Sequence, residues 1–202
     1  MPLLNKKNIT NTLSVGVWKI SETKEELLEC YKKIGGDIIS VVETKSETRI
    51  KQWLSVRLLL NEFYSNVSIT YDKFGKPMLS NESELSISHA GNYAVIALNT
   101  VKKCGIDIEQ ISAKVERIKH KFLSSEELKK VSSVEELTLF WCAKEALYKL
   151  YGEKELIFNE QLLVDYKIKP NTLLGRIKIN EREEKHELLA EKIEDYFLVY
   201  TI

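Results

Sequence analysis

The sequence is poor in residues that break, loosen or cross-link a chain. Its 202 residues include only eight glycines, three prolines and three cysteines. No stretch rich in glycine, serine or proline separates one part from another, so we expect no flexible interdomain linker. Cys30, Cys104 and Cys142 are odd in number, far apart and flanked by apolar residues. This pattern favours reduced thiols in the core over a disulfide framework or a metal cluster.

An excess of charge and a long apolar run are also missing. The 30 Lys+Arg residues balance 30 Asp+Glu residues, whereas non-specific nucleic-acid binding requires an excess of basic residues. No apolar run approaches the roughly 18–20 residues of a membrane-spanning helix, and residues 1–12 lack the apolar core of a secretory signal. We therefore predict a cytoplasmic protein with neither nucleic acid nor a membrane as its partner, although a local basic patch stays open.

The composition is that of a globular protein, 44% hydrophobic, and the length suits one domain or two small halves because domains usually run about 100–200 residues. In the first half, Thr23 and Glu26 make a capping box for a helix that ends at Gly35-Gly36. Helical spacing predicts a second helix over residues 46–64. Strands are predicted over 15–20, 38–42, 85–88 and 93–98, with a turn at 72–77 and a hairpin link at 89–92.

In the second half, residues 105–109 alternate apolar and acidic side chains, which predicts a strand. Capping boxes at Ser124 and Ser133 begin two helices, the second running to about Tyr151. Further strands are predicted over 175–179, 187–190 and 196–202. Both halves thus follow the order strand, helices, closing strands. This is weak evidence for an internal duplication, because no residue-level repeat supports it.

Two pairs of charged residues could carry chemistry. Period two places Asp107 and Glu109 on the same face of their strand, and hard oxygen ligands suit Mg²⁺. The alternative is a solvated strand face, since charged residues are usually exposed. Glu145 and Lys149 share a helix face, where the alternative is an exposed ion pair. Glu145 could join Asp107 and Glu109 as a third carboxylate around one metal ion.

Other candidates are less specific by themselves. Ser88 and His89 lie at the end of a strand, but a Ser-His nucleophile pair is disfavoured because adjacent strand residues point to opposite faces and no group to orient His89 can be named; a structural histidine stays open. Lys76 and Arg49 are candidate phosphate ligands. The glycine-rich fingerprints of P-loop and Rossmann proteins and the His-Glu-x-x-His pattern of zincins do not occur in the sequence.

Taken in order, four blocks resemble the signature blocks of the Sfp-type 4′-phosphopantetheinyl transferases. Their order and spacing both match, and together they run from Phe74 to Lys149. The blocks are Phe74-Gly75-Lys76-Pro77, Ser86-Ile87-Ser88-His89, Gly105-Ile106-Asp107-Ile108-Glu109, and Trp141-Cys142-Ala143-Lys144-Glu145 with Lys149.

The resemblance implies an α+β fold of two similar halves related by a pseudo-twofold axis, with coenzyme A bound in the cleft between them. We place the halves at residues 1–102 and 103–202, the second carrying the metal-binding carboxylates. The implied enzyme is a 4′-phosphopantetheinyl transferase with holo-acyl-carrier-protein synthase activity. It moves the phosphopantetheine arm of coenzyme A to a serine of an apo acyl or peptidyl carrier protein and releases 3′,5′-adenosine bisphosphate.

The resemblance also implies roles for individual residues. Asp107, Glu109 and Glu145 would hold Mg²⁺, and Glu145 is in addition a candidate acceptor of the serine proton, directly or through water. Lys149 would neutralise charge on the phosphate oxygens in the transition state. The implied coenzyme A ligands are Lys76 and His89 on the phosphates, Ser88 and Pro77 along the nucleotide, and Arg49 on the 3′-phosphate.

The sequence departs from the family pattern in two places. A basic cluster that family members often carry before the first long helix is reduced here to four candidates, and Ala90 follows His89 where the family often has a hydroxyl. The four candidates of the basic cluster are Lys45, Arg49, Lys51 and Arg57.

The segment 114–121 contains basic residues that would face an acidic carrier protein, unless it is an ordinary solvated helix face.

Two other functions stay open. The first is a different Mg²⁺-dependent phosphotransfer enzyme built on the same carboxylates. The second is a non-catalytic module that binds coenzyme A or carrier proteins. A monomer is expected because two fused halves already form the cleft between themselves.

Overall fold

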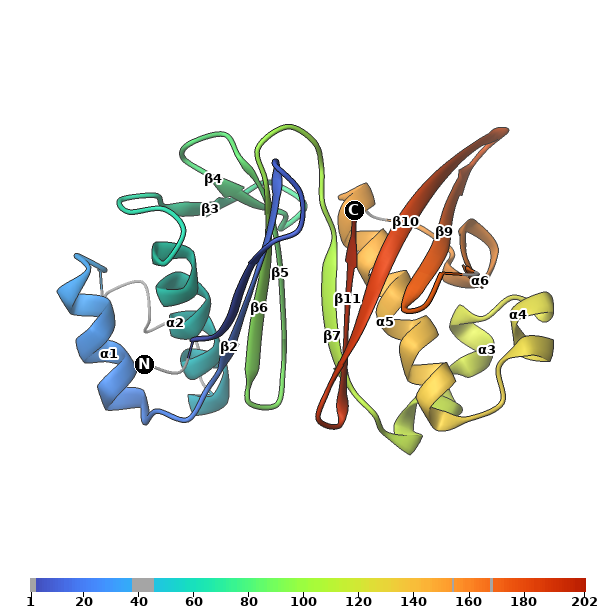
Figure 1. The fold of residues 1–202 in the computed structure, drawn as a ribbon, viewed down its shortest axis with the longest axis horizontal. Helices are drawn as coiled ribbons and strands as arrows, with labels where there is room; N and C mark the ends of the chain where they lie inside the picture. The colour runs from blue at the N-terminus through green and yellow to red at the C-terminus, as the bar shows by residue number, and fades with distance from the viewer. Residues whose placement is uncertain (1–2, 38–45, 154, 168) are drawn as a thin grey trace.

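The computed structural model describes residues 3–37, 46–153, 155–167 and 169–202. They form two antiparallel sheets that face each other, with helices on the outer side of each sheet (Figure 1). The predicted α+β class with two similar halves is confirmed. None of the helices in these ranges is long and apolar enough to cross a membrane. The strand predicted over 38–42 lies outside the described residues.

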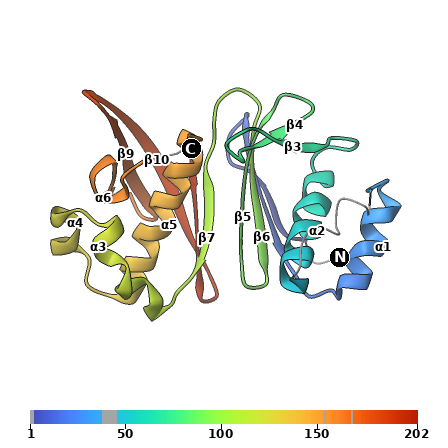
Figure 2. The ribbon, with the colours of Figure 1, turned by 180° about the vertical axis from the view of Figure 1, so that it is seen from behind.

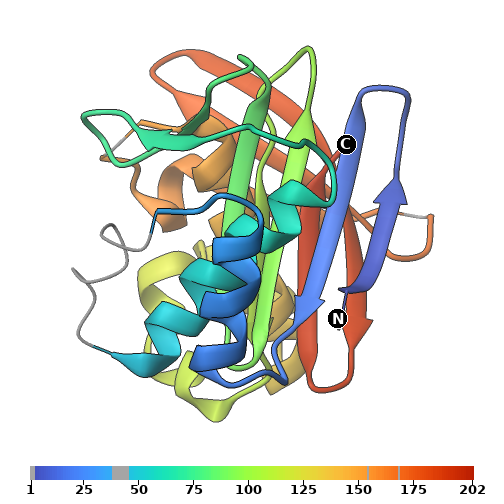
Figure 3. The ribbon, with the colours of Figure 1, turned by 90° about the vertical axis from the view of Figure 1, so that its left-hand side faces the viewer.

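The first sheet has six strands in the order β1-β2-β6-β5-β4-β3. Helices α1 (Lys24–Lys33) and α2 (Glu47–Asn61) cover one of its faces (Figure 3). The predicted capping box is present, because Thr23 and Glu26 each accept the other's backbone N–H. The strands are β1 (Leu3–Asn8), β2 (Leu13–Lys19), β3 (Ile69–Tyr71), β4 (Pro77–Leu79), β5 (Glu84–Ala90) and β6 (Tyr93–Asn99).

The predicted hairpin between β5 and β6 is confirmed, with a tighter link than expected. His89 and Ala90 still pair with β6, and the turn consists of Gly91 and Asn92. Gly91 has a φ of +50°, a conformation that favours glycine. His89 is therefore held in the ladder of a sheet, which fixes the position of its ring more firmly than a loop would.

The second sheet has five strands in the order β7-β11-β10-β9-β8. The long helix α5 (Val134–Tyr151) lies along it, as the view from behind also shows (Figure 2). Both predicted capping boxes, at Ser124 and Ser133, are present. The other elements are β7 (Ile106–Gln110), β8 (Leu162–Tyr166), β9 (Thr172–Ile179), β10 (Arg182–Ile193), β11 (Tyr196–Thr201), the 3₁₀ helix η2 (Ala113–Arg117), α3 (Lys119–Phe122), α4 (Ser125–Lys130) and α6 (Phe158–Gln161).

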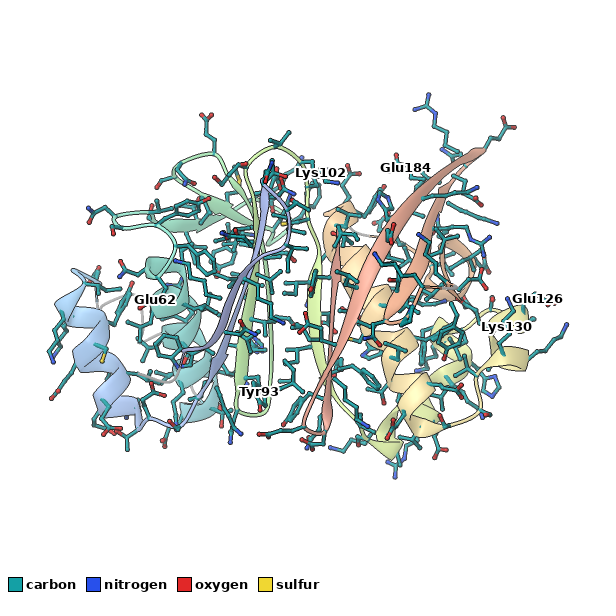
Figure 4. The ribbon with its side chains drawn as sticks, viewed as in Figure 1. Glu62, Tyr93, Lys102, Glu126, Lys130 and Glu184 are labelled. Carbon is teal, nitrogen blue, oxygen red and sulfur yellow. The ribbon has the colours of Figure 1, made fainter. Side chains whose placement is uncertain are left out.

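A core of apolar side chains joins the two sheets. Ile106 and Ile108 of β7 are buried in it together with Val95 of β6. Tyr93, labelled in Figure 4, meets Tyr196 of β11 edge to face at a centroid distance of 4.9 Å. Separate cores lie between each sheet and its own helices. The two halves are thus fused through apolar packing, which holds the elements at their interface in place.

The three cysteines are free thiols, as predicted. Cys104 and Cys142 are buried, and Cys30 is half-buried. Burial raises the pKa of the Cys104 thiol to about 12, so this thiol is protonated and unreactive at neutral pH.

Candidate active site at the interface of the two halves

Strands β5 and β7 meet through two serine side chains. Ser88 Oγ donates to Asp107 Oδ1 at 2.6 Å, and Ser86 Oγ accepts from the backbone N–H of Ile106 at 3.1 Å. Both serines are buried, and their spacing of two residues places them on one face of β5. The first half therefore contributes directly to the position of Asp107, a role that the sequence did not predict for Ser88.

Asp107 is the centre of the site and is 2% exposed. Its Oδ1 also accepts a hydrogen bond from Lys149 Nζ at 2.5 Å, which makes the two residues an ion pair. Its Oδ2 is buried and has no hydrogen-bond partner within the described part of the chain, although buried carboxylate oxygens are normally satisfied. The solvated strand face that the sequence left open is ruled out for Asp107. Lys149 pairs with Asp107 across the interface between α5 and β7, and the exposed pair with Glu145 does not form.

Glu109 and Glu145 extend the negative charge around Asp107. Burial raises the pKa of Glu109 to about 7; the charge of Asp107 adds to this rise, whereas Trp141 and Lys149 oppose it. Burial, followed by the charge of Asp107, also raises the pKa of Glu145 to about 7, and Lys149 again opposes the rise. The charge of Asp107 thus raises the pKa of both glutamates, and the charge of Lys149 lowers the pKa of both. The cluster has more negative charge than Lys149 neutralises.

Gly105 explains how α5 approaches β7 closely enough to build this cluster. A β-carbon at Gly105 would lie 1.9 Å from the backbone oxygen of Ala146. Glycine is therefore required by the contact between the start of β7 and α5. Ala146 directly follows Glu145, and Lys149 is one helical turn after Glu145. The glycine of the β7 motif sets the separation across which these side chains meet Asp107.

The three carboxylates are the candidate ligands for Mg²⁺. Among residues 3–37, 46–153, 155–167 and 169–202, no group of three or more His, Cys, Asp or Glu side chains is arranged to hold a metal ion. The donor chemistry nevertheless suits a hard cation, because it offers carboxylate oxygens and leaves the buried Oδ2 of Asp107 unsatisfied. Burial, followed by the charge of Asp107, raises the pKa values of Glu109 and Glu145, and a bound cation would oppose both effects by stabilising the ionised carboxylates.

A large cavity, of about 550 Å³, opens beside the cluster. Five of the predicted site residues line it, and Lys149 joins it to Asp107. Ser88, Asp107 and Glu145 do not line this cavity, and Glu109 lines a second cavity of about 310 Å³. The predicted residues in the wall of the large cavity are Arg49, Lys76, Pro77, His89 and Lys149.

Arg49 and His89 come together from α2 and β5. The Arg49 guanidinium lies 2.7 Å from His89 Nε2 and 3.1 Å from Nδ1. Burial lowers the pKa of His89, and the positive charge of Arg49 lowers it further. His89 is therefore neutral at pH 7 and carries one N–H donor. These two predicted residues therefore lie side by side in the wall of the same cavity.

Lys76 is already paired. It follows a turn in which Gly75 has a φ of +85° and the Asp72 side chain accepts from the backbone N–H groups of Phe74 and Lys76. Lys76 Nζ forms an ion pair with Glu84 Oε2 at 2.7 Å. A ligand phosphate would have to share or replace Glu84 as the partner of this ammonium group.

The cavity has an aromatic wall that the sequence did not predict. Arg57 lies over the Trp53 ring, with Cζ 3.3 Å from the centroid, and Tyr71 lies in the same wall. Burial lowers the pKa of Arg57, but a guanidinium stays charged in proteins. Arg49, Trp53 and Arg57 are spaced by four residues along α2, a spacing that could have revealed their common face. Of the other basic candidates, Lys51 interacts electrostatically with Glu26, and Lys45 lies outside the described residues.

The fold and the site together define a class: a two-halved α+β protein with a cationic and aromatic cavity next to a carboxylate-lysine cluster, suited to phosphate chemistry. Residues 103–198, which contain the carboxylates and Lys149, match the family model of the 4′-phosphopantetheinyl transferase superfamily. This segment therefore belongs to the 4′-phosphopantetheinyl transferase superfamily. The resemblance found in the sequence is confirmed at the level of the superfamily, and the Sfp-type subfamily stays a prediction.

A relative agrees with this assignment. A protein of Synechocystis sp. with the name "Putative 4′-phosphopantetheinyl transferase" is 30% identical to this chain over 116 residues. The aligned region covers 50% of this chain and 47% of the relative. The chain thus matches about half the length of that curated relative.

Proposed function

We propose that the protein is a 4′-phosphopantetheinyl transferase of the Sfp type that modifies a serine of an apo acyl or peptidyl carrier protein. Coenzyme A would donate the 4′-phosphopantetheine arm, and 3′,5′-adenosine bisphosphate would leave. Superfamily membership of residues 103–198 supports this reaction. The proposed active site lies in the cleft between residues 1–102 and 103–202. A cytoplasmic location and a monomeric state stay predictions.

One observation carries the proposal: buried Asp107, which pairs with the partly exposed Lys149 and keeps one unsatisfied oxygen, lies next to a cavity lined by cations from the other half. Transfer of a phosphoryl-type group needs positioning and electrostatic stabilisation more than a covalent nucleophile. A carboxylate cluster for a metal ion and a lysine that reaches the cavity meet these needs.

Asp107, Glu109 and Glu145 are the residues that would hold Mg²⁺. The ion would neutralise charge on the diphosphate of coenzyme A. Lys149 contacts Asp107 and lines the large cavity, so its ammonium group can reach a phosphate oxygen there. Its positive charge would stabilise the negative charge that develops on the phosphate oxygens in the transition state.

The serine of the carrier protein must lose a proton as it attacks. We assign the proton to a carboxylate oxygen of Glu145, directly or through one water molecule. Burial raises the pKa of Glu145 to about 7, and a cation held by the cluster would lower this pKa again, so that the carboxylate would be ionised and able to accept the proton. The serine oxygen then forms a bond to the β-phosphorus, and the bond from that phosphorus to adenosine bisphosphate breaks.

The first half would bind the nucleotide. Arg49 and His89 would donate to phosphate oxygens, since they lie together in the wall of the large cavity. Lys76 would exchange Glu84 for a phosphate, and Pro77 follows it in the same wall. Ser88 would act through Asp107, because its hydroxyl donates to that carboxylate.

The basic segment 114–121 is our proposed contact for the acidic carrier protein. Lys114 lines the second cavity together with Glu109, so the segment borders the carboxylate cluster. Lys114, Arg117 and Lys121 are exposed and available to a partner. This positive charge next to Glu109 supports the segment as the contact for the carrier protein.

The test is the intact mass of a purified apo carrier protein after incubation with this protein, coenzyme A and Mg²⁺. We expect a gain of one phosphopantetheine group that is lost with a chelator and with Asp107→Asn. Asp165→Asn is the matched control, because Asp165 also lies in ion pairs, with Lys130 and Arg176, away from the cavities. This control should transfer the group at the rate of the unmodified protein.

Three outcomes would contradict the proposal. Undiminished transfer by Asp107→Asn would refute the metal assignment. Binding of coenzyme A without transfer to several unrelated carrier proteins would favour a non-catalytic binding module. Hydrolysis or transfer from another phosphorylated donor, with no use of coenzyme A, would indicate a different Mg²⁺-dependent phosphotransfer enzyme.

A further inference from the structure

Trp141 donates a hydrogen bond to one of the proposed metal ligands. Its indole Nε1 lies 3.0 Å from Glu109 Oε1, and both residues line the second cavity. Trp141 is on α5, one helical turn before Glu145. A single helix therefore supplies one proposed ligand from Glu145 and a hydrogen bond to another ligand from Trp141.

The indole ring is held between two aromatic rings from other elements. Phe158 of α6 stacks on it at a centroid distance of 5.6 Å, and Phe122 of α3 meets it edge to face at 5.1 Å. These arrangements are the favoured geometries for aromatic pairs. Because contacts on two sides limit the rotation of the ring, the direction in which its N–H points is fixed.

Lys144 holds the backbone of the same two phenylalanines. This lysine is fully buried, and its ammonium group donates to the backbone oxygens of Phe122 and Phe158 and to the carboxylate of Glu127. An ammonium group has three donors, and each has a partner here. Lys144 thus joins α3 and α6 to α5 on either side of the tryptophan.

We propose that Trp141 is a positioning residue that holds the Glu109 carboxylate in the orientation needed to bind the divalent cation. The inference rests on the proposed function, because it takes Glu109 as a metal ligand. The simpler explanation is that the indole N–H merely needs an acceptor when buried. The two explanations differ in what happens to metal affinity when the N–H group alone is removed.

Trp141→Phe removes the N–H and keeps an aromatic ring between Phe122 and Phe158. The matched control is Trp18→Phe, because Trp18 Nε1 also faces a glutamate oxygen, Glu22 Oε2 at 3.5 Å, in the other half. Mn²⁺ serves as a probe for the site, since it shares the preference of Mg²⁺ for oxygen ligands. Binding is measured by the electron paramagnetic resonance signal of free Mn²⁺, with and without coenzyme A, after circular dichroism has shown that each variant is folded.

We expect Trp141→Phe to weaken Mn²⁺ binding by roughly ten- to a hundredfold, the usual effect of losing a residue that orients a metal ligand. Trp18→Phe should bind Mn²⁺ as the unmodified protein does. In turnover assays, Trp141→Phe should raise the KM for Mg²⁺ far more than it lowers kcat at saturating Mg²⁺. A general packing defect would not produce this split.

A second measurement does not depend on the folding of Trp141→Phe. Addition of Mg²⁺ should change the tryptophan emission of the folded Trp18→Phe variant, because the indole of Trp141 contacts the proposed ligand. Mn²⁺ binding by Trp141→Phe at unchanged affinity, or emission that does not respond to Mg²⁺ in a protein that binds Mn²⁺, would overturn the positioning role alone. If the unmodified protein binds no Mn²⁺ in either condition, the metal assignment fails and the positioning role fails with it.

Discussion

Helix α5 carries two lysines, Lys144 and Lys149, that form ion pairs in different surroundings. Lys144 and its partner Glu127 have side chains that are 0% and 4% exposed. Both oxygens of Glu127 accept backbone N–H groups, from Val164 on one and from Ser124 on the other. Every donor of Lys144 is also used. This pair is complete within the protein.

The pair of Lys149 and Asp107 is incomplete. Lys149 is 26% exposed and lines the large cavity, and Asp107 keeps one buried oxygen without a partner. Two further carboxylates raise the local negative charge. A complete buried pair stabilises one structure, whereas an incomplete pair beside a cavity can accept a ligand. The comparison predicts that loss of Lys144 affects folding and that loss of Lys149 affects the reaction.

The largest expected effect is on stability. Lys144→Met should lower the free energy of unfolding by about 3–5 kcal/mol, because it leaves the charge of Glu127 buried without its partner. Urea denaturation followed by circular dichroism measures this change. Lys129→Met is the control, since Lys129 pairs with Glu126 at an exposed position and should change stability by less than about 0.5 kcal/mol. Equal effects of the two substitutions would show that the buried pair has no special role.

The next effect is on turnover. Lys149→Met should lower kcat for phosphopantetheine transfer by roughly 10²–10³-fold, the usual effect of losing one group that stabilises charge in the transition state. Its effect on stability should be smaller than that of Lys144→Met, because Lys149 is partly exposed and Asp107 keeps the hydrogen bond from Ser88. Rapid-quench kinetics with a carrier protein and thermal unfolding test both parts. A folded variant with normal kcat would remove Lys149 from the mechanism.

The carboxylate cluster should make metal-free stability dependent on pH. The pKa values of Glu109 and Glu145 are raised from 4.5 to about 7 in the folded protein. Between these two values the folded state binds more protons than the unfolded state, so stability falls as the pH rises from about 4.5 to 7. Thermal unfolding with a chelator should show this fall, and Mg²⁺ should raise the melting temperature much more at pH 8 than at pH 5.

The control for this prediction is the double variant Glu109→Gln, Glu145→Gln. It should flatten the fall in stability and abolish the response to Mg²⁺. His89 contributes with the opposite sign, because burial lowers its pKa; its contribution remains in the double variant and can be subtracted. A pH profile that is the same with and without the two carboxylates would contradict the charge cluster.

The smallest effect concerns the partner. Lys119→Glu with Lys121→Glu should slow modification of an acidic carrier protein several-fold at low salt, and the difference should shrink as salt screens the charges. Coenzyme A affinity, measured by calorimetry, should not change. Lys129→Glu with Lys130→Glu is the matched control on neighbouring α4. If coenzyme A binding falls together with modification, the segment 114–121 does not act as a docking surface.

The sequence predicted the local structure well where the signal was local. All three capping boxes are present, and the alternation at residues 105–109 gave the position of β7. Strand β1 was missed, because its sequence Leu-Leu-Asn-Lys-Lys-Asn has no alternating pattern. Strand β8 was missed as well: it is a five-residue strand, and a short apolar run does not distinguish a strand from the end of a helix.

The site was predictable in composition but not in its contacts. Motif spacing brought Asp107, Glu109, Glu145 and Lys149 into one hypothesis, and the structure brings them close enough for their charges to act on one another. The partner of Lys149 could not be derived from helical spacing, because it depends on how closely α5 approaches β7. For the same reason the sequence gives no sign that Lys144 is directed into the core while Glu145, the next residue, joins the charge cluster.

The serine contacts between β5 and β7 also protect the protein from association. Strand β7 lies at the edge of the second sheet, and an uncovered strand edge offers free N–H and C=O groups to other chains. On that edge, the backbone N–H of Ile106 donates a hydrogen bond to the hydroxyl of Ser86, and the first half packs over the strand. The second half, if produced alone, would expose this edge and the apolar side chains beside it, and would aggregate.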